Sequence, residues 1–381
     1  MTSFRPCFQT VFHYNSPVQL QFGGKMTLNF ALVGCGRIVK KHIDALLNIP
    51  KARLVAVCDI VPEKAEKAGK TAGVPWYTSY DEMLTAHPET DVVNILTPSG
   101  LHPKHTIDIV KKYKKHIVCE KPMALKLSDA DEMIRTCDLN GVRLFIVKQN
   151  RFNLPVQILR KKLENGGFGR LVMGTVRVRW CRKQEYYDSD PWRGTWAYDG
   201  GVITNQASHH IDLLEWMLGE PVSVMAMNGT YLVNIEADDT CAAIIRFRNG
   251  ALGIVEATTA TRPADLEGSL SILGEKGNCV IGGFAVNKMQ EWNFEGETPD
   301  ERKEILEKYS ENPPNVYGFG HIRYLESVID CIENGKHALV DGLEGRKSLE
   351  LINAIYESVE TGKEVHLVFE PKESKLGRTN F

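Results

Sequence analysis

Two side chains that can move protons stand in conspicuous places in this sequence. Lys121 lies between Glu120 and Pro122 at the end of an apolar run. His209 closes a segment, 199–209, that contains two consecutive glycines. A lysine there can polarise a hydroxyl oxygen, and histidine is the usual general base near neutral pH. On residue type alone, the alternatives are a surface lysine and a buried structural histidine. Alcohol oxidation by this pair would also require a hydride acceptor beside it.

A glycine turn near the start of the chain predicts that acceptor. Gly34 and Gly36 follow an apolar run and precede residues of helical character. The first glycine permits a tight turn, and the second lets the backbone approach a pyrophosphate at a helix N-terminus. Val39 occupies the third position of the dinucleotide fingerprint, where glycine or alanine is usual, so the match is incomplete. The alternative is a similar glycine turn that binds no dinucleotide.

Further residues at strand ends favour NAD over NADP. Asp59 ends the second apolar run, where a carboxylate accepts hydrogen bonds from the adenosine ribose and repels a 2′-phosphate. Thr97 and Pro98 begin a loop where ligands of open α/β sheets sit, although Ser99 is equally suited to cap a helix there. The expected NAD contacts are Gly34, Gly36, Arg37, Ile38, Asp59, Thr97, Pro98, His102, Glu120, Lys121 and Gln149.

The elements that must position these side chains follow from the apolar pattern up to residue 148. Short apolar runs are typical of buried parallel strands, and they lie at 30–33, 54–58, 92–96, 116–119 and 144–147. Helical stretches separate them, near 37–48, 62–72, 79–86, 102–114 and 128–139. This alternation predicts a doubly wound Rossmann domain over residues 26–148.

The pattern changes after residue 149. We expect a helix, a long strand, an aromatic loop and a second helix, at 154–165, 170–180, 184–204 and 208–218. Four or five strands follow between 222 and 293, and helices near 320–334 and 343–360 close the chain. The run of strands without helices predicts an α+β domain, residues 149–381, built on an open antiparallel sheet flanked by helices. The free face of that sheet is expected to join a homodimer or homotetramer.

The composition excludes several classes of protein. The 381 residues carry a net charge of −2, so we expect no nucleic-acid partner, and no apolar run reaches the length of a membrane span. The nine cysteines form no CxxC pair, so we expect no metal site and reduced thiols in the cytoplasm. Residues 1–25 lack a secretory pattern. We expect a loose arm or an upstream-start artefact there, with a genuine extra element as the alternative.

Several segments together resemble the Gfo/Idh/MocA oxidoreductase family. They are the glycine turn at 34–36, the stretches 97–102 and 120–122, and the segment 200–209. The resemblance narrows to the WlbA-type branch, the UDP-N-acetyl-2-amino-2-deoxyglucuronate dehydrogenases, through residues 147–151, 184–188, 192–196 and 316–321. It implies NAD-dependent oxidation of the sugar 3-hydroxyl to a ketone, in diamino-sugar synthesis for surface polysaccharide. Some members of that branch reoxidise their bound NADH with 2-oxoglutarate.

The resemblance also implies roles for single residues. Lys121 matches the family's active-site lysine and His209 its histidine, while Asn205 stands where much of the wider family has aspartate. A neutral amide cannot raise the pKa of a histidine as a carboxylate would, so His209 is expected to be neutral at pH 7. His209 then accepts the proton while Lys121 polarises the oxygen, or the two roles are exchanged or shared. The expected substrate contacts are Lys121, Asn150, Arg151, Arg193, Asn205, His209 and Tyr317.

Three other functions stay open at this point. Within the family, the substrate is alternatively an inositol, a free aldose or another nucleotide sugar. A glycosidase-like use of the same fold recycles NAD in place. A third alternative is an NAD-binding regulator without catalysis, which would tolerate the loss of Lys121 and His209.

Overall fold

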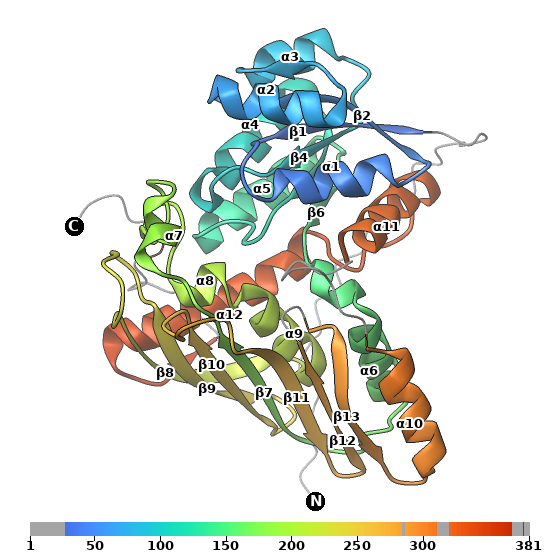
Figure 1. The fold of residues 1–381 in the computed structure, drawn as a ribbon, viewed down its shortest axis with the longest axis vertical. Helices are drawn as coiled ribbons and strands as arrows, with labels where there is room; N and C mark the ends of the chain where they lie inside the picture. Colours follow the sequence, from blue (N-terminus) through green and yellow to red (C-terminus); the bar gives the residue numbers. More distant parts are fainter. Residues whose placement is uncertain (1–26, 284–285, 311–319, 368–375, 377–381) are drawn as a thin grey trace, which may run out of the picture.

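Two β-sheets form the two halves of the molecule (Figure 1). The computed structural model describes residues 27–283, 286–310, 320–367 and 376. The first sheet comes from the part of the chain drawn in blue to blue-green, and the second from the part drawn in green to red. The expected extension at 1–25 lies outside the described residues.

The first sheet is parallel and has six strands in the order β3-β2-β1-β4-β5-β6. They are β1 (Leu28–Val33), β2 (Ala52–Cys58), β3 (Trp76–Tyr77), β4 (Val92–Ile95), β5 (His116–Cys119) and β6 (Leu144–Ile146). The five expected strands are confirmed, and β3 was not predicted because two residues carry no apolar pattern. Strand order reverses at β1, so a ligand crevice forms beyond the carboxyl ends of β1 and β4.

Five helices connect these strands, as the sequence predicted. They are α1 (Val39–Leu47), α2 (Pro62–Ala72), α3 (Tyr80–Ala86), α4 (His102–Tyr113) and α5 (Leu127–Leu139). They lie against the sheet in Figure 1, and the strand residues Phe30, Ile95 and Val118 are fully buried. The expected Rossmann architecture is therefore confirmed.

The second sheet has eight strands in the order β13-β12-β11-β7-β10-β9-β8-β14. They are β7 (Leu171–Arg179), β8 (Pro221–Gly229), β9 (Thr240–Phe247), β10 (Leu252–Thr258), β11 (Glu267–Gly274), β12 (Gly277–Gly282), β13 (Lys288–Phe294) and β14 (Val365–His366). All neighbouring pairs are antiparallel except β7 with β10, which run parallel. The expected mostly antiparallel sheet is confirmed, but six strands lie between 221 and 294, where four or five were predicted.

The helices of this half agree less completely with the expectation. The predicted helices correspond to α6 (Leu154–Glu164), α9 (Ser208–Leu218), α11 (Gly320–Asn334) and α12 (Gly342–Thr361). The sequence did not predict α10 (Pro299–Lys308). The stretch expected to be a loop at 184–204 contains two short helices, α7 (Gln184–Asp188) and most of α8 (Val202–Asn205). These helices are too short to produce a recognisable 3.6-residue period.

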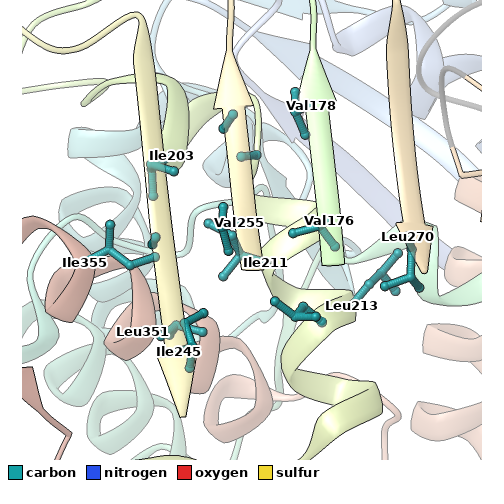
Figure 2. Close-up of a cluster of buried hydrophobic side chains, with 14 of the residues drawn as sticks. Val176, Val178, Ile203, Ile211, Leu213, Ile245, Val255, Leu270, Leu351 and Ile355 are labelled. Carbon is teal, nitrogen blue, oxygen red and sulfur yellow. The ribbon is translucent and has the colours of Figure 1, made fainter. Parts of the chain in front are cut away.

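One face of the second sheet packs on α9 and α12 and forms the larger core. Figure 2 shows Val176 and Ile245 of the sheet facing Ile211 of α9 and Leu351 of α12. The opposite face is open, and Met225, Met227 and Ile244 are exposed on it. This exposed apolar surface is where the expected self-association would occur. The dimer or tetramer itself stays a prediction.

The end of the chain returns to the first half of the molecule. Tyr324, Leu325 and Val328 of α11 pack in one core with Phe30 of β1 and Ile43 of α1. Helix α12 contacts β8 of the second sheet and α5 of the first half, and lies between the two in Figure 1. These two helices therefore join the domains that meet at the site.

Among the residues that the structure describes, no helix is both long and apolar enough to cross a membrane. The described cysteines, eight in number, are all free thiols.

Replacing Leu351 with alanine tests the packing of α12 on the sheet. Leu351 has no exposed surface, so Leu351→Ala should lower the free energy of unfolding by about 2–5 kcal/mol, since it leaves a cavity. Leu343 on the same helix is 61% exposed, and Leu343→Ala should change that free energy by less than about 0.5 kcal/mol. Urea unfolding of both variants measures the difference, and equal losses would contradict the assigned packing.

Candidate active site

A cleft of about 490 Å³ lies between the two halves, beyond the carboxyl ends of β4 and β5. Eight of the predicted site residues line it: Arg37, Ile38, Glu120, Lys121, Gln149, Arg193, Asn205 and His209. The remaining lining residues are Leu96, Ser99, Trp180, Cys181, Arg182, Lys183, Tyr186, Trp192 and Gln206. Residues that are scattered along the sequence therefore meet in one place, although Gly34, Gly36 and Asp59 are not among the lining residues.

The two predicted catalytic side chains enter this cleft from opposite halves. Lys121 follows β5, and its Nζ donates to the backbone oxygen of Asn205 at 2.7 Å. His209 lies in the first turn of α9, and its Nε2 is 3.1 Å from Nε2 of Gln149. Because an amide nitrogen donates, this contact makes Nε2 of His209 the acceptor and places the ring proton on Nδ1. Nε2 thus carries the lone pair that a general base needs.

Asn205 and His209 lie on two different helices, because α8 ends at Asn205 and α9 begins at Ser208. The amide of Asn205 donates to Oδ1 of Asp199, whose other oxygen accepts from the backbone N–H of Gly194 at 2.7 Å. The sequence interpretation did not assign Asp199 a role, although it lies in the same glycine-rich segment.

Burial lowers the pKa of both Lys121 and His209, but the strongest neighbouring charges act in opposite directions on the two groups. Burial lowers the pKa of Lys121, and the negative charges of Glu120 and Asp199 oppose that effect. Burial also lowers the pKa of His209 well below its ordinary 6.5, and the positive charges of Lys121 and Lys148 add to it. The sequence analysis predicted a neutral His209 because the amide of Asn205 cannot raise its pKa. In the structure, burial and two neighbouring cations lower that pKa.

Glu120 is a buried anion next to Lys121. Burial opposes its ionisation, but the hydrogen bond and charge of His42, with the charges of His321 and Lys121, outweigh burial and hold the pKa of Glu120 at about 2. Its Oε1 lies 3.0 Å from Nε2 of His42, and its Oε2 accepts from the backbone N–H of Lys121 at 3.1 Å. Glu120 therefore fixes the backbone from which the Lys121 side chain departs.

The glycine turn fits a dinucleotide. Gly34 has a φ of +102°, and a Cβ there would lie 2.7 Å from the carbonyl of Leu96, so only glycine is accommodated. A Cβ on Gly36 would meet nothing within 4 Å, so open space lies where a pyrophosphate approaches the start of α1. Asp59 accepts from the backbone N–H of Cys35 at 2.7 Å and holds the turn. Its oxygens keep lone pairs for ribose hydroxyls.

Buried polar atoms of residues that line the cleft also indicate that it binds a polar ligand. Oε1 of Gln149, Nδ1 of His209 and Nε2 of Gln206 are buried and have no hydrogen-bond partner among the described residues. Buried polar groups are nearly always hydrogen-bonded in proteins. These three atoms therefore fit a polar ligand, such as a nicotinamide carboxamide or a sugar hydroxyl, at this end of the cleft.

Thr97, Pro98 and His102 lie behind the cleft wall rather than on it. The two ring nitrogens of His102 are each 2.8 Å from a backbone oxygen, one of Thr97 and one of Pro122. His102 therefore joins the loop after β4 to the loop that carries Lys121, and it acts on a cofactor only through those loops. Ser99 lines the cleft, and no side chain caps α4.

The structure places Arg151 and Asn150 away from the cleft, contrary to expectation. Arg151 makes a bidentate pair with Asp212, at 2.8 Å for both bonds, and a third bond to Glu344 at 3.0 Å. Each of its three nitrogens thus donates to a carboxylate, and the guanidinium serves a structural ion pair. Asn150 is buried and does not line the cleft. Tyr317 lies outside the described residues.

Among the nine lining residues that were not predicted as site residues, Arg182, Lys183 and Tyr186 bring basic and aromatic side chains to the cleft. The guanidinium groups of Arg37, Arg182 and Arg193 all lie within 5.6 Å of the centre of the Tyr186 ring. A cluster of basic and aromatic residues at 180–193 is visible in the sequence, and the segments 184–188 and 192–196, which overlap it, carried part of the family resemblance. With Lys121 and Lys183 the described cleft wall carries five basic side chains and one acid, Glu120.

Comparison with known families identifies both halves. A family description that reads "Oxidoreductase family, NAD-binding Rossmann fold" matches residues 28–148. Its companion, "Oxidoreductase family, C-terminal alpha/beta domain", matches residues 160–367. Two relatives with named activities are a myo-inositol 2-dehydrogenase from Thermotoga maritima, 26% identical over 89% of this chain and 98% of its own, and a D-glucoside 3-dehydrogenase from Escherichia coli, 25% identical over 89% and 97%.

Two solved structures are similar over most of the chain. The WlbA dehydrogenase from Bordetella pertussis, in complex with NADH and UDP-GlcNAcA, is 44% identical and has a TM-score of 0.84, covering 91% of this chain and 99% of its own. The WlbA dehydrogenase from Chromobacterium violaceum, in complex with the same two molecules, is 41% identical with a TM-score of 0.84, covering 92% and 98%.

Replacing Gly36 with alanine tests the cofactor site. Because the added methyl group meets no protein atom, Gly36→Ala should leave the melting temperature unchanged. It should raise the Kd for NAD at least ~10-fold, equivalent to about 1.4 kcal/mol, by blocking the approach of the pyrophosphate. Gly34→Ala is the contrast, because it should lower the melting temperature as well. Unchanged NAD affinity in Gly36→Ala, measured by fluorescence titration, would refute this placement.

Replacing Lys148 with methionine tests the electrostatics of His209. The buried Nζ of Lys148 donates to Ser348 at 2.6 Å and lies 3.5 Å from Asp212, which Arg151 still holds in the variant. Loss of this positive charge should raise the pKa of His209, so the acid limb of the kcat/KM profile should move to higher pH. The exposed Lys126 supplies the control, Lys126→Met. An acid limb that stays in place would mean that His209 is not the base.

Proposed function

Because the chain belongs to the Gfo/Idh/MocA oxidoreductase family, we propose that it uses NAD to oxidise the 3-hydroxyl of a UDP-N-acetylglucosaminuronic acid-type nucleotide sugar to the 3-keto sugar. The coarser activity, that of an NAD-dependent dehydrogenase acting on an alcohol, is the family's own. The observation that carries the proposal is the meeting of Lys121 and His209 in one cation-rich cleft beside the glycine turn. The likeness to two WlbA dehydrogenases with UDP-GlcNAcA bound supports the choice of sugar.

The chain's own residues would divide the proton chemistry as follows. When bound, the nicotinamide supplies the acceptor for the hydride that leaves the sugar carbon. His209 takes the hydroxyl proton on Nε2, where the substrate hydroxyl replaces the Gln149 amide as the partner of the single lone pair. Lys121 donates to the reacting oxygen and stabilises the charge that develops there. Its position is held by the Asn205 carbonyl and the Glu120 backbone contact.

The charge of the cleft favours a nucleotide sugar acid over the neutral alternatives. A UDP-sugar acid carries a diphosphate and a carboxylate, and five basic side chains face it across the described wall. Inositol and free aldoses carry no charge, so they would gain little from those side chains. They remain the second candidate because the relatives at 23–26% identity include inositol and apiose dehydrogenases.

The first experiment asks which sugar is oxidised. Purified protein is incubated with NAD⁺ and UDP-N-acetylglucosaminuronic acid, with and without 2-oxoglutarate, and the nucleotide sugar is examined by mass spectrometry. We expect the sugar to lose two hydrogens, and a larger yield with 2-oxoglutarate would identify it as the oxidant that regenerates NAD⁺. An unchanged sugar would discard this substrate, and the same assay with myo-inositol and D-glucose would then test the second candidate.

The same assay tests the role of Lys121. Lys121→Ala should reduce turnover by about 10²-fold or more while NAD still binds, because the developing negative charge loses its partner. Lys126→Ala removes a nearby exposed lysine and should leave turnover unchanged. Equal turnover in the two variants would remove Lys121 from the mechanism and favour an NAD-binding regulator.

A further inference from the structure

Arg182 is held in a fixed orientation in the wall of the cleft. It follows Trp180 and Cys181, just beyond the end of β7. Its Nη1 donates to the backbone oxygen of Cys181 at 2.7 Å and to Oδ1 of Asp265 at 2.9 Å. Its guanidinium lies 5.2 Å from the centre of the Trp180 ring. These contacts restrict the side chain, so little conformational entropy remains to be lost when it binds a ligand.

The anchoring contacts of Arg182 use only one of its three nitrogens. Nε and Nη2 have no hydrogen-bond acceptor among the described residues. These two nitrogens form one edge of the planar guanidinium, and their parallel N–H groups match the two oxygens of a carboxylate or a phosphate. The side chain is only 17% exposed and lines the cleft. Its unpaired edge is therefore a partly desolvated anion receptor.

Other arginines near the site lack this combination. Nε of Arg193 donates to Asp190 and its Nη1 donates to the hydroxyl of Tyr186, so its Nε–Nη2 edge is already partly occupied. Arg151 is paired through all three nitrogens and does not face the cleft. The ion pair with Asp265 compensates the charge of Arg182, but it leaves the Nε–Nη2 edge as a donor. Arg182 is thus better placed than Arg193, the arginine expected from the sequence, to provide a bidentate fork.

We propose that Arg182 is a specificity-determining residue whose Nε–Nη2 edge binds an anionic group of the substrate, a carboxylate or a phosphate, and thereby orients the sugar toward Lys121 and His209. The proposal rests on the proposed function for the identity of the sugar, and on the geometry of Arg182 for the anion. A neutral sugar offers this edge only uncharged hydroxyl oxygens, which bind a guanidinium more weakly than a carboxylate or phosphate does, so Arg182 selects charged substrates over neutral ones. Because it touches the substrate away from the reacting carbon, its loss should raise KM more than it lowers kcat.

The test is calorimetric titration of the NAD-loaded protein with three nucleotides. UDP-N-acetylglucosaminuronic acid carries both anions, UDP-N-acetylglucosamine lacks the carboxylate, and UDP lacks the sugar. Arg182→Gln should raise the Kd for the sugar acid at least ~10-fold. Arg182→Lys keeps a charge beside Asp265 but loses the fork, so it should show most of the same loss. If only the sugar acid binds more weakly, Arg182 contacts the carboxylate; if all three do, it contacts a phosphate.

Two controls keep the result interpretable. Arg248→Gln breaks an exposed pair with Glu220 and should leave all three affinities unchanged. Melting temperatures and NAD affinity of each variant show whether the fold and the cofactor site survive. A change of less than twofold for every ligand, in folded Arg182→Gln and Arg182→Lys, would overturn the proposal.

The failure of the proposed function would look different. In that case the wild-type protein would bind none of the three nucleotides. Titration with D-glucuronate and with inorganic pyrophosphate would then test Arg182 directly, because these probes carry only the anions. Binding that is lost in both Arg182 variants would support the anion receptor without the nucleotide sugar, and binding that is equal in wild type and variants would refute it.

Discussion

The site depends on keeping a cation between two domains that are built from different parts of the chain. Lys121 comes from the first sheet, and its Nζ bonds a carbonyl of the second half at the junction of α8 and α9. Burial disfavours the charged form of this side chain, and Glu120 and Asp199 oppose that effect from opposite halves. Glu120 is itself an anion because His42 lies against it. Each of these buried charges is therefore stabilised by a neighbouring charge of opposite sign.

A second buried network fixes the other side of the cleft. Arg151 pairs with Asp212, three residues beyond His209 on α9, and also with Glu344 on α12. Such buried pairs add little net stability, because desolvation offsets the attraction, but breaking one leaves an uncompensated charge. Gln149 lies on the same short segment as Arg151, and His209 lies on the same helix as Asp212. The ion pair therefore holds Gln149 and His209 at a fixed distance. Arg151 thus has a structural role here, because it ties the segment of Gln149 to the helix that carries His209.

Local pattern was enough to predict most of the fold. The Rossmann strands are short apolar runs buried on both faces, and helix α9 begins and ends where the sequence indicated. Strand β3, helices α7 and α8, and the parallel pairing of β7 with β10 were missed. Two- to five-residue elements have no measurable period, and strand partners are chosen by packing across the sheet. The packing of α11 against the first half could not be predicted for the same reason, because the sequence around α11 does not indicate which element it contacts.

The sequence by itself indicated the glycine turn, the carboxylate at Asp59 and the two residues that we propose handle the proton, because each belongs to a local motif with a chemical requirement. Only the tertiary structure decided that Arg182 lines the cleft and that Arg151 does not. Arg151 is removed from it by Asp212, 61 residues away, and Arg182 is held in it by Asp265, 83 residues away. Arginines look alike in a sequence, and a guanidinium becomes a ligand receptor or a structural ion pair according to which carboxylates the fold brings to it.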